Sequence, residues 1–377
     1  MTKKRSLLFS LVRSLCAIGI ALLVATLLIF ISAGGDSLGE RLRTTGEALQ
    51  QLLIGPLFRK SGAFNTKNFT DILAAMIPTI FTGLSVCVMF SANQFNMGVE
   101  GGCMLGAFVA AMCAVYVPMA AGLHPVFCVL MGAIVCGLMM LIPAVLKAKL
   151  NVSEMVSSLM LNYVILYIIK YFMNTYLSDK TKGSIQSYPF LDTAKIAPLV
   201  DNGSNLSVGF LVALVFVALT ALFLYRTRWG YAIRMIGMNQ SFAKYAGLPV
   251  AGTIILCQVV GGILAGLGGG IEMLGRYGTY NWGALPGYGW TGMTIAILAG
   301  NNPLFVPLAA LFMAYLDKGC SLMSTYCGVP SQLISIIQAV IFLFFAAEQF
   351  LANYRQKLVV KSAREELAAQ EGGNGNG

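Results

Sequence analysis

The sequence predicts an all-α protein, a polytopic bundle of about ten transmembrane helices. Of its 377 residues, 57% are hydrophobic and only 11% are charged, whereas about a quarter of the residues in a soluble globular protein are charged. The apolar residues form runs of about 20, the length that an α-helix needs to cross roughly 30 Å of hydrocarbon. These runs lack the alternating pattern of a membrane β-barrel. The chain is therefore expected to be an integral membrane protein.

The first 32 residues predict a cytoplasmic N-terminus followed by a first span. Four cations, the last of them Arg13, precede the apolar run 15–31. This run is too long for the hydrophobic region of a signal peptide. In residues 33–69, leucines recur near helical spacing among charged residues, which predicts an external amphipathic helix, with a plain loop as the alternative.

The other spans are expected within 70–352, which would form the membrane core. Their predicted positions are 70–91, 98–117, 124–146, 155–175, 206–225, 250–272, 287–300, 303–321 and 332–352. An even number of spans returns the chain to the side of the membrane on which it started. The tail 353–377, which ends in GGNGNG, is predicted to be disordered in the cytoplasm.

The distribution of charge predicts which side each loop faces. The loop 226–249 has four cations, among them Arg228 and Arg234, and no acidic residue, and uncompensated cations mark the cytoplasmic side. The loops expected outside are nearly balanced, with five cations and four acids in 33–71 and three of each in 176–205. Both termini are thus expected on the cytoplasmic side of a plasma membrane. The net charge of +10 follows this sidedness and does not indicate a nucleic-acid partner.

Two polar, glycine-bearing segments interrupt the helical pattern. They read SANQFNMGVEGG at 91–102 and GRYGTYNWGALPGYGWTG at 275–292. If the second to fifth spans correspond to the seventh to tenth, the chain holds an inverted repeat with broken helices near 92–98 and 275–289. Interrupted helices at matching positions indicate a substrate path, because unwound backbone is tolerated only where it lines a cavity.

The residues at these breaks favour a cargo with a flat ring. Asn96 offers hydrogen bonds, and Phe95, Tyr288 and Trp290 offer aromatic faces, which suit a sugar or a nucleobase. For the aromatic residues within 277–282, a belt at the membrane surface is an equally good interpretation. The charged residues near span ends are expected to snorkel to the surface: Lys170, Glu272, Asp317, Lys318 and Glu348. The lack of an acidic relay at mid-membrane favours uncharged cargo and disfavours a proton-driven carrier.

Other polar residues in or near spans have a structural and a functional interpretation. For Glu100, bracing of the helix that starts at the first break is favoured over substrate contact. Asn151 or Ser153 can cap the fifth helix, with Glu154 in its first turn. Asn162 lies deeper in that helix, where a buried amide needs a partner.

No enzymatic or cofactor site is expected. Seven of the nine cysteines lie singly in apolar runs, as small packing residues do. The chain has no P-loop, no HExxH and no Gly-x-Ser-x-Gly sequence. A transporter without a proton relay and without a P-loop is either driven by a partner or passive.

Four motifs in order carry a resemblance to a known family. They are FNMGVEGGCMLGAF at 95–108, NVSEMVSSLMLNY at 151–163, RTRWGYAIRMIGMNQSFAKYAGL at 226–248 and PGYGWTGMTIAIL at 286–298. From about 70 to 349, the chain resembles the permease subunits of ATP-binding cassette (ABC) importers in the ribose and branched-chain amino acid class. It is most similar to the nucleoside permeases that work with a basic-membrane-lipoprotein type receptor.

The resemblance implies a permease that imports a nucleoside, with a ribose-type sugar as the alternative cargo. ATP hydrolysis is then expected on a cytoplasmic ABC ATPase and not on this chain. A second permease subunit, related or identical, and an extracellular substrate-binding lipoprotein complete the expected assembly in membrane lipid. An ion-coupled or passive carrier is the remaining alternative.

The resemblance also implies two groups of site residues. The loop 226–249 is expected to dock on the ATPase, with its small residues facing that protein, through Arg228, Gly230, Arg234, Gly237, Asn239, Ala243 and Gly247. The expected substrate path comprises Phe95, Asn96, Glu100, Asn162, Tyr163, Tyr288, Trp290 and Thr291. Thr291 stands where the family usually has aspartate, a departure that bears on the identity of the cargo and not on import.

Overall fold

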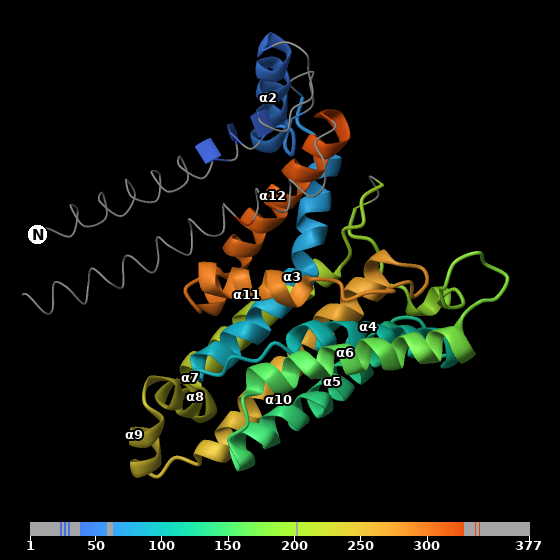
Figure 1. Cartoon of the computed structure of the whole chain (residues 1–377). Coiled ribbons are helices and arrows are strands. Elements are labelled where there is room, and N and C mark those ends of the chain that lie inside the picture. Colours follow the sequence, from blue (N-terminus) through green and yellow to red (C-terminus); the bar gives the residue numbers. More distant parts are fainter. Residues whose placement is uncertain are drawn as a thin grey trace, which may run out of the picture. The chain divides into compact units, whose positions relative to one another are not determined.

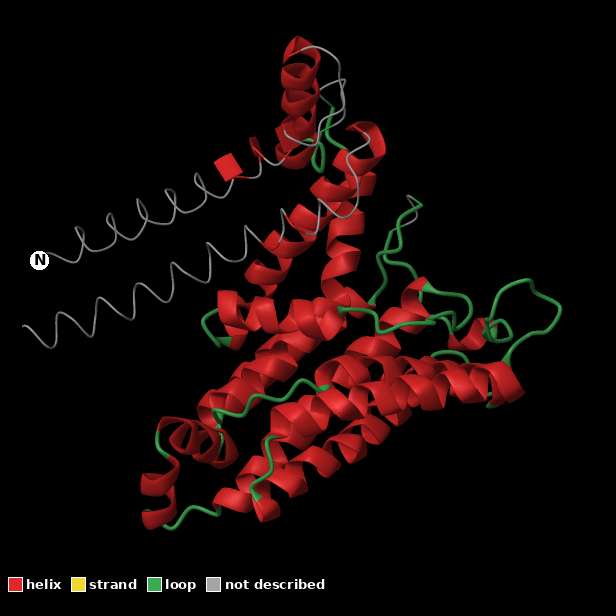
Figure 2. Cartoon of the chain, viewed as in Figure 1, coloured by secondary structure: helices red, strands yellow, loops and turns green. Residues whose placement is uncertain are grey.

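The computed structural model describes residues 38–58, 63–200 and 203–327, together with single residues at 23, 24, 26, 27, 29, 30, 336 and 339. These residues form helices joined by loops, with isolated β-bridges and no strand (Figures 1 and 2). The prediction of an all-α fold is thereby confirmed. Most of the expected first span, the expected tenth span and the C-terminal tail lie outside the described residues.

Seven segments of the described chain are long and apolar enough to cross a membrane. Six of them are α3 (Thr66–Ser91), α4 (Val99–Tyr116), α5 (Leu123–Leu150), α6 (Glu154–Phe172) with the π-helix η1 (Met173–Leu177), α7 (Gly209–Arg226) and α10 (Val250–Arg276). The seventh joins the 3₁₀-helix η3 (Pro303–Phe305) to α12 (Val306–Cys327). The total of ten spans stays a prediction.

The chain divides into two compact units, Met1–Gly55 with Gly319–Gly377, and Pro56–Lys318. In the first unit, the expected amphipathic segment forms the helix α2 (Leu38–Leu53). Ala48 and Leu52 are buried, whereas Leu38 is 71% exposed. The helix is confirmed, and its position on the outer surface stays a prediction.

In the second unit, α10 packs against α3, α4 and α5 through small residues (Figure 1). A Cβ atom at Gly269 would lie 2.0 Å from the carbonyl oxygen of Cys103, so the backbones of α10 and α4 are in direct contact. Such close approach is how membrane helices gain packing energy without a hydrophobic driving force between them. Cys103 and Cys136 are free and buried in this core, as expected of small packing residues.

Two unwound segments interrupt the bundle where the sequence predicts breaks. The first break, residues 92–98, joins α3 to α4, and the second break, residues 277–287, joins α10 to α11 (Tyr288–Leu298). With 11 residues, α11 is about 16 Å long, roughly half of the hydrocarbon thickness. The expected span 287–300 is therefore a half-length helix, because its apolar run starts only after the glycines at 287 and 289.

The two ends of α10 carry different structures. At its start lie the short helices α8 (Arg228–Met238) and α9 (Gln240–Tyr245), which follow α7. At its other end lies the loop 178–208, which includes the 3₁₀-helix η2 (Asp192–Ala194). Ile196 N of this loop donates to Leu274 O at 3.1 Å, and the buried His124 contacts Thr193 Oγ1 at 2.9 Å. These hydrogen bonds attach the loop to the helix bundle.

Candidate functional site

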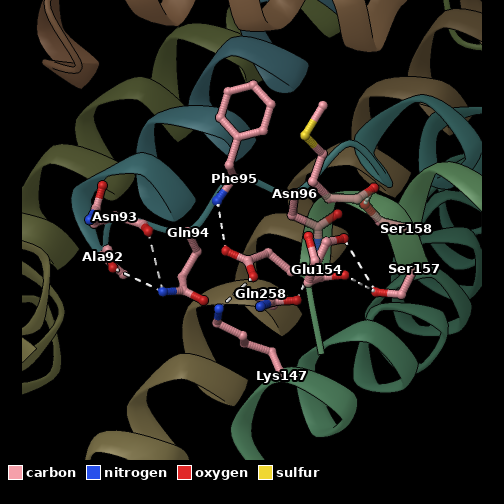
Figure 3. A network of polar contacts seen from close by, with 12 residues as sticks. Ala92, Asn93, Gln94, Phe95, Asn96, Lys147, Glu154, Ser157, Ser158 and Gln258 are labelled. Carbon is pink, nitrogen blue, oxygen red and sulfur yellow. Dashed lines mark hydrogen bonds and ion pairs between the residues drawn. The ribbon is translucent and has the colours of Figure 1, made fainter. Parts of the chain in front are cut away.

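A row of polar side chains on α6 holds the first break. Glu154, Ser158 and Asn162 follow one another at intervals of four residues, which places them on one face of the helix. Glu154 Oε1 accepts from Phe95 N at 3.3 Å, and Ser158 Oγ accepts from Met97 N at 2.9 Å (Figure 3). The row therefore supplies acceptors for backbone amides that no helix satisfies, which is a requirement for unwound backbone at membrane depth.

Asn162 extends the same row to the start of α4. Its Oδ1 accepts from Gly101 N at 3.0 Å, and its Nδ2 donates to Met97 O at 2.9 Å. A Cβ atom at Gly101 would lie 2.5 Å from Asn162 Oδ1, so glycine is needed at this position. The expectation that Asn162 has a partner is confirmed, and the partner is the backbone of the first break.

The first break is also tied to α10 and to the end of α5. Asn96 Oδ1 accepts from Gly98 N at 2.7 Å, and Asn96 Nδ2 donates to Gln258 Oε1 at 2.8 Å. The Glu154 carboxylate pairs with Lys147 Nζ at 2.9 Å (Figure 3). Because both charges are mostly shielded from water, the pair lowers the cost of burying each of them.

The expected caps of α6 are absent from its first turn. Ser153 occupies the N-cap position without a side-chain capping bond, and Asn151 ends α5 with a φ of 52°. Glu154 lies in the first turn as predicted, but its carboxylate is directed to Lys147 and to the first break. The tertiary contacts to the break take the place of local capping.

Glu100 joins the two breaks. It is 2% exposed and lies in the first turn of α4, and its two carboxylate oxygens accept hydrogen bonds from Gly287 N and Gly289 N at the start of α11. The N-termini of α4 and α11 thus meet at one carboxylate, whose negative charge offsets the positive ends of both helix dipoles. Glu100 does brace a helix, but that helix is α11, which follows the second break, and not only its own.

The contact at Glu100 requires a small residue on α11. A Cβ atom at Gly289 would lie 2.6 Å from Glu100 N and 2.7 Å from Glu100 Cα. Glycine is therefore the residue that lets the two helix starts touch. Gly289 serves this close approach, whereas Gly287 has open space around it and adopts a left-handed φ of 84°.

A second buried carboxylate lies beside the second break. Glu272 is 3% exposed, pairs with Arg276 Nη1 at 3.1 Å and accepts from the Tyr288 hydroxyl at 3.3 Å. The expectation that Glu272 snorkels is wrong, because a cation one helical turn away makes burial possible. Lys318 is likewise paired, with Asp71 Oδ2 at 2.8 Å.

The expected path residues fall into an exposed group and a buried group. Phe95, Tyr163 and Trp290 are 38%, 48% and 49% exposed, so their rings are open to a molecule outside the chain. The buried residues Asn96, Glu100 and Asn162 use their polar atoms within the protein, as described above. Tyr288 and Thr291 are partly buried and also bond within the chain, Tyr288 to Glu272 and Thr291 Oγ1 to Gly287 O at 3.1 Å. Tyr163 follows Asn162 in sequence but projects from another face of α6.

The aromatic residues of the second break do not behave alike. Tyr280 is 1% exposed and packs on Phe108 with ring centroids 5.3 Å apart. The belt interpretation is therefore wrong for Tyr280, which belongs to the core. Trp282 lies against Tyr280 and Tyr288, at 6.2 and 5.9 Å between centroids.

The helices α8 and α9 begin with side-chain caps. Thr227 Oγ1 accepts from Gly230 N, and Asn239 Oδ1 accepts from Phe242 N, each at 3.0 Å. The caps explain why the polar loop forms two short helices and why Asn239 lies between them. Gly247 has a φ of 78° and ends the second one in the left-handed conformation that glycine favours.

The small residues of α8 face the interior of the chain. A Cβ atom at Gly230 would lie 2.2 Å from Phe223 O, and one at Gly237 would lie 2.1 Å from Ser91 O at the end of α3. Ala243 of α9 is also fully buried. The expectation that the small residues face another protein is wrong for Gly230 and Gly237, because their small size serves contact with α7 and α3. Ala243 packs with Ile236 of α8 and Ile254 of α10.

Large side chains form the outer face of these helices. Met238, Phe242 and Tyr245 are 82%, 56% and 92% exposed, and we call them the α8–α9 surface. Arg228 lies over the Trp229 ring at 5.2 Å, and the Arg234 guanidinium lies over Tyr225 at 5.5 Å. The sequence holds the signal for this surface, since apolar residues stand out in an otherwise polar loop.

Comparison with known proteins places the chain in a family. The family model described as "Branched-chain amino acid transport system / permease component" matches residues 68–346. The chain is 33% identical over 297 residues to the glucose ABC transporter permease protein TsgB13 of Haloferax volcanii, which covers 76% of this chain and 78% of that protein.

Two bacterial relatives are similar over the same length. The guanosine ABC transporter permease protein NupP of Bacillus subtilis is 32% identical, over 78% of this chain and 85% of that protein. The nucleoside ABC transporter permease protein NupB of Lactococcus lactis is 30% identical, over 76% of this chain and 81% of that protein. The chain belongs to the family of permease components of branched-chain amino acid transport systems, as its four motifs predict.

Proposed function

We propose that this chain is the membrane subunit of an ATP-driven importer that moves a nucleoside. The family match carries this proposal, because it extends over both breaks and over α8 and α9. Two relatives of similar length are named for guanosine and for nucleosides. A sugar is the second candidate, because another relative is named for glucose.

A cytoplasmic ABC ATPase docks on the α8–α9 surface. Aromatic and methionine side chains are enriched at protein interfaces. The exposed Met238 ends α8, and the exposed Phe242 and Tyr245 belong to α9, the next helix. This assignment puts α8 and α9 inside the cell, the loop 178–208 outside and both termini in the cytoplasm of a multi-pass plasma-membrane protein. The contact of Gly237 with Ser91 supports a direct effect of docking on the first break.

The cargo moves past exposed rings that a polar framework holds. Phe95 stacks on Phe90 at 5.3 Å, and with Tyr163 and Trp290 it offers flat surfaces without charge. Glu100, Asn96 and Asn162 position the backbone that carries these rings. Thr291 offers no charge to the cargo, and its hydroxyl donates to the backbone at Gly287.

Two further partners complete the assembly. A second permease subunit covers the exposed face of α6, where Tyr167, Tyr171 and Phe172 line an apolar groove. An extracellular lipoprotein delivers the cargo at the side of the loop 178–208. The remaining apolar surface faces membrane lipid, and ATP is hydrolysed by the ATPase and not by this chain.

Uptake of labelled compounds tests this function. Cells that produce the chain with its ATPase, partner permease and receptor are expected to take up guanosine and adenosine, and to lose uptake when any component is omitted. Uptake of ribose or glucose alone would assign the chain to sugars. Nucleoside uptake that survives loss of the ATPase would contradict an ATP-driven importer.

A further inference from the structure

We propose that a cavity beside the second break binds the nucleobase of the cargo, an inference that rests on the proposed nucleoside import. The cavity has a volume of about 210 Å³. Its walls come from the end of α6 with η1, from Ile185 of the loop 178–208 and from residues 280–283 of the second break. It lies at the end of α10 opposite to α8 and α9, where the receptor would release cargo.

Hydrogen bonds hold the walls of the cavity together. Ser187 N donates to Tyr280 O at 3.0 Å, and Tyr280 N donates to Ser187 Oγ at 2.9 Å. Phe190 N also donates to Gly278 O at 2.9 Å. The loop and the second break therefore form one wall whose shape does not depend on a ligand, and a preformed site costs less to occupy.

The chemistry of the lining suits a flat, uncharged, polar ring. Trp282 offers an aromatic surface, and its ring is held by Tyr277, Tyr280 and Tyr288 at 6.0, 6.2 and 5.9 Å between centroids. Asn174 and Asn281 each offer an amide donor and an amide acceptor, which match the edge of a base. The lining has one cation, Lys170, and no acidic residue. It therefore disfavours a positively charged cargo.

The size of the cavity and the local backbone point to a single ring system. Pockets that enclose drug-sized ligands begin at about 300 Å³, so the cavity is too small for an entire nucleoside and leaves the ribose outside. Asn174 belongs to the π-helix η1, and π-helical turns are frequent at functional sites. Aromatic stacking binds different bases with little discrimination between them, which suits an importer of several nucleosides.

Protection from cysteine labelling tests the site in the assembled transporter. The Gly283→Cys variant is treated with a maleimide with and without adenosine, adenine or ribose, and the unsubstituted chain gives the background. Gly283 lines the cavity and is exposed, and a Cβ atom there would meet no atom within 4 Å. Adenosine and adenine are expected to slow the labelling about tenfold, whereas ribose is not. Adding Trp282→Ala should remove the protection, and Trp282→Phe should keep part of it.

A matched control separates the site from general damage. Tyr188→Ala removes an exposed aromatic side chain of the loop 178–208 that does not line the cavity and should leave the protection intact. Protection by ribose alone, or no protection in a chain that transports nucleosides, would overturn the inference. If the chain transports no nucleoside, the proposed function fails, and protection by adenine would then still support a base site.

Discussion

Replacement of Glu100 by alanine is expected to abolish transport and to lower the thermal stability of the purified transporter. The change leaves Gly287 N and Gly289 N without their acceptors in a buried position. Each buried donor that loses its partner costs about 1–3 kcal/mol, so the loss is roughly 2–6 kcal/mol. Uptake of labelled guanosine and the melting temperature in detergent measure the two effects.

Two variants distinguish the contact at Glu100 from a general loss of carboxylate. Glu100→Gln keeps an oxygen acceptor but loses the charge between the two helix starts, so it should retain part of the stability and little transport. Glu47→Ala removes a carboxylate from an exposed pair with Arg43, which is worth at most about 1 kcal/mol. Wild-type transport and stability in Glu100→Ala would show that the two breaks do not depend on this contact.

The double replacement of Phe242 and Tyr245 by aspartate is expected to prevent binding of the ATPase and, with it, all uptake. Both side chains are more than half exposed, so the fold of the permease should remain stable. Loss of one anchor residue from an interface costs about 2 kcal/mol, or roughly thirtyfold in Kd. Co-purification of the ATPase with the tagged permease measures the effect.

A matched variant at the other end of the bundle serves as the control for docking. Tyr188→Asp introduces one aspartate in place of an aromatic residue on the loop 178–208, at a side chain that is 45% exposed, and it should leave ATPase binding unchanged. Retention of the ATPase by the Phe242 and Tyr245 variant would place the docking surface elsewhere on the chain.

Most of the fold could be predicted from the sequence because lipid restricts the choices. Each long apolar run has to form a helix whose backbone is satisfied internally, and α3, α5 and α10 were predictable from their composition. The breaks could be predicted because asparagine, glutamine and glycine replace apolar residues at 92–98, and asparagine and glycine replace them again before Tyr288. The polar loop 226–249 likewise could not be a span.

The contacts between distant segments could not be predicted in the same way. Glu100 and Gly287 are separated by 187 positions, and nothing in either local sequence names the other as its partner. A glycine indicates a close approach of another group but does not identify that group. From the sequence alone, Gly237 could equally have contacted an ATPase or, as observed, Ser91. The pair of Glu272 and Arg276 is local, and its four-residue spacing could have indicated it, although Glu272 was expected to snorkel.

Transport by proteoliposomes tests the central claim most directly. Vesicles are reconstituted with this chain, its partner permease and the ATPase, with the receptor and labelled guanosine on the side of the loop 178–208 and ATP on the side of α8 and α9. We predict that guanosine accumulates against its gradient only when ATP is on the α8–α9 side. Equal accumulation without ATP, or with ATP on the opposite side alone, would contradict an importer driven through these helices.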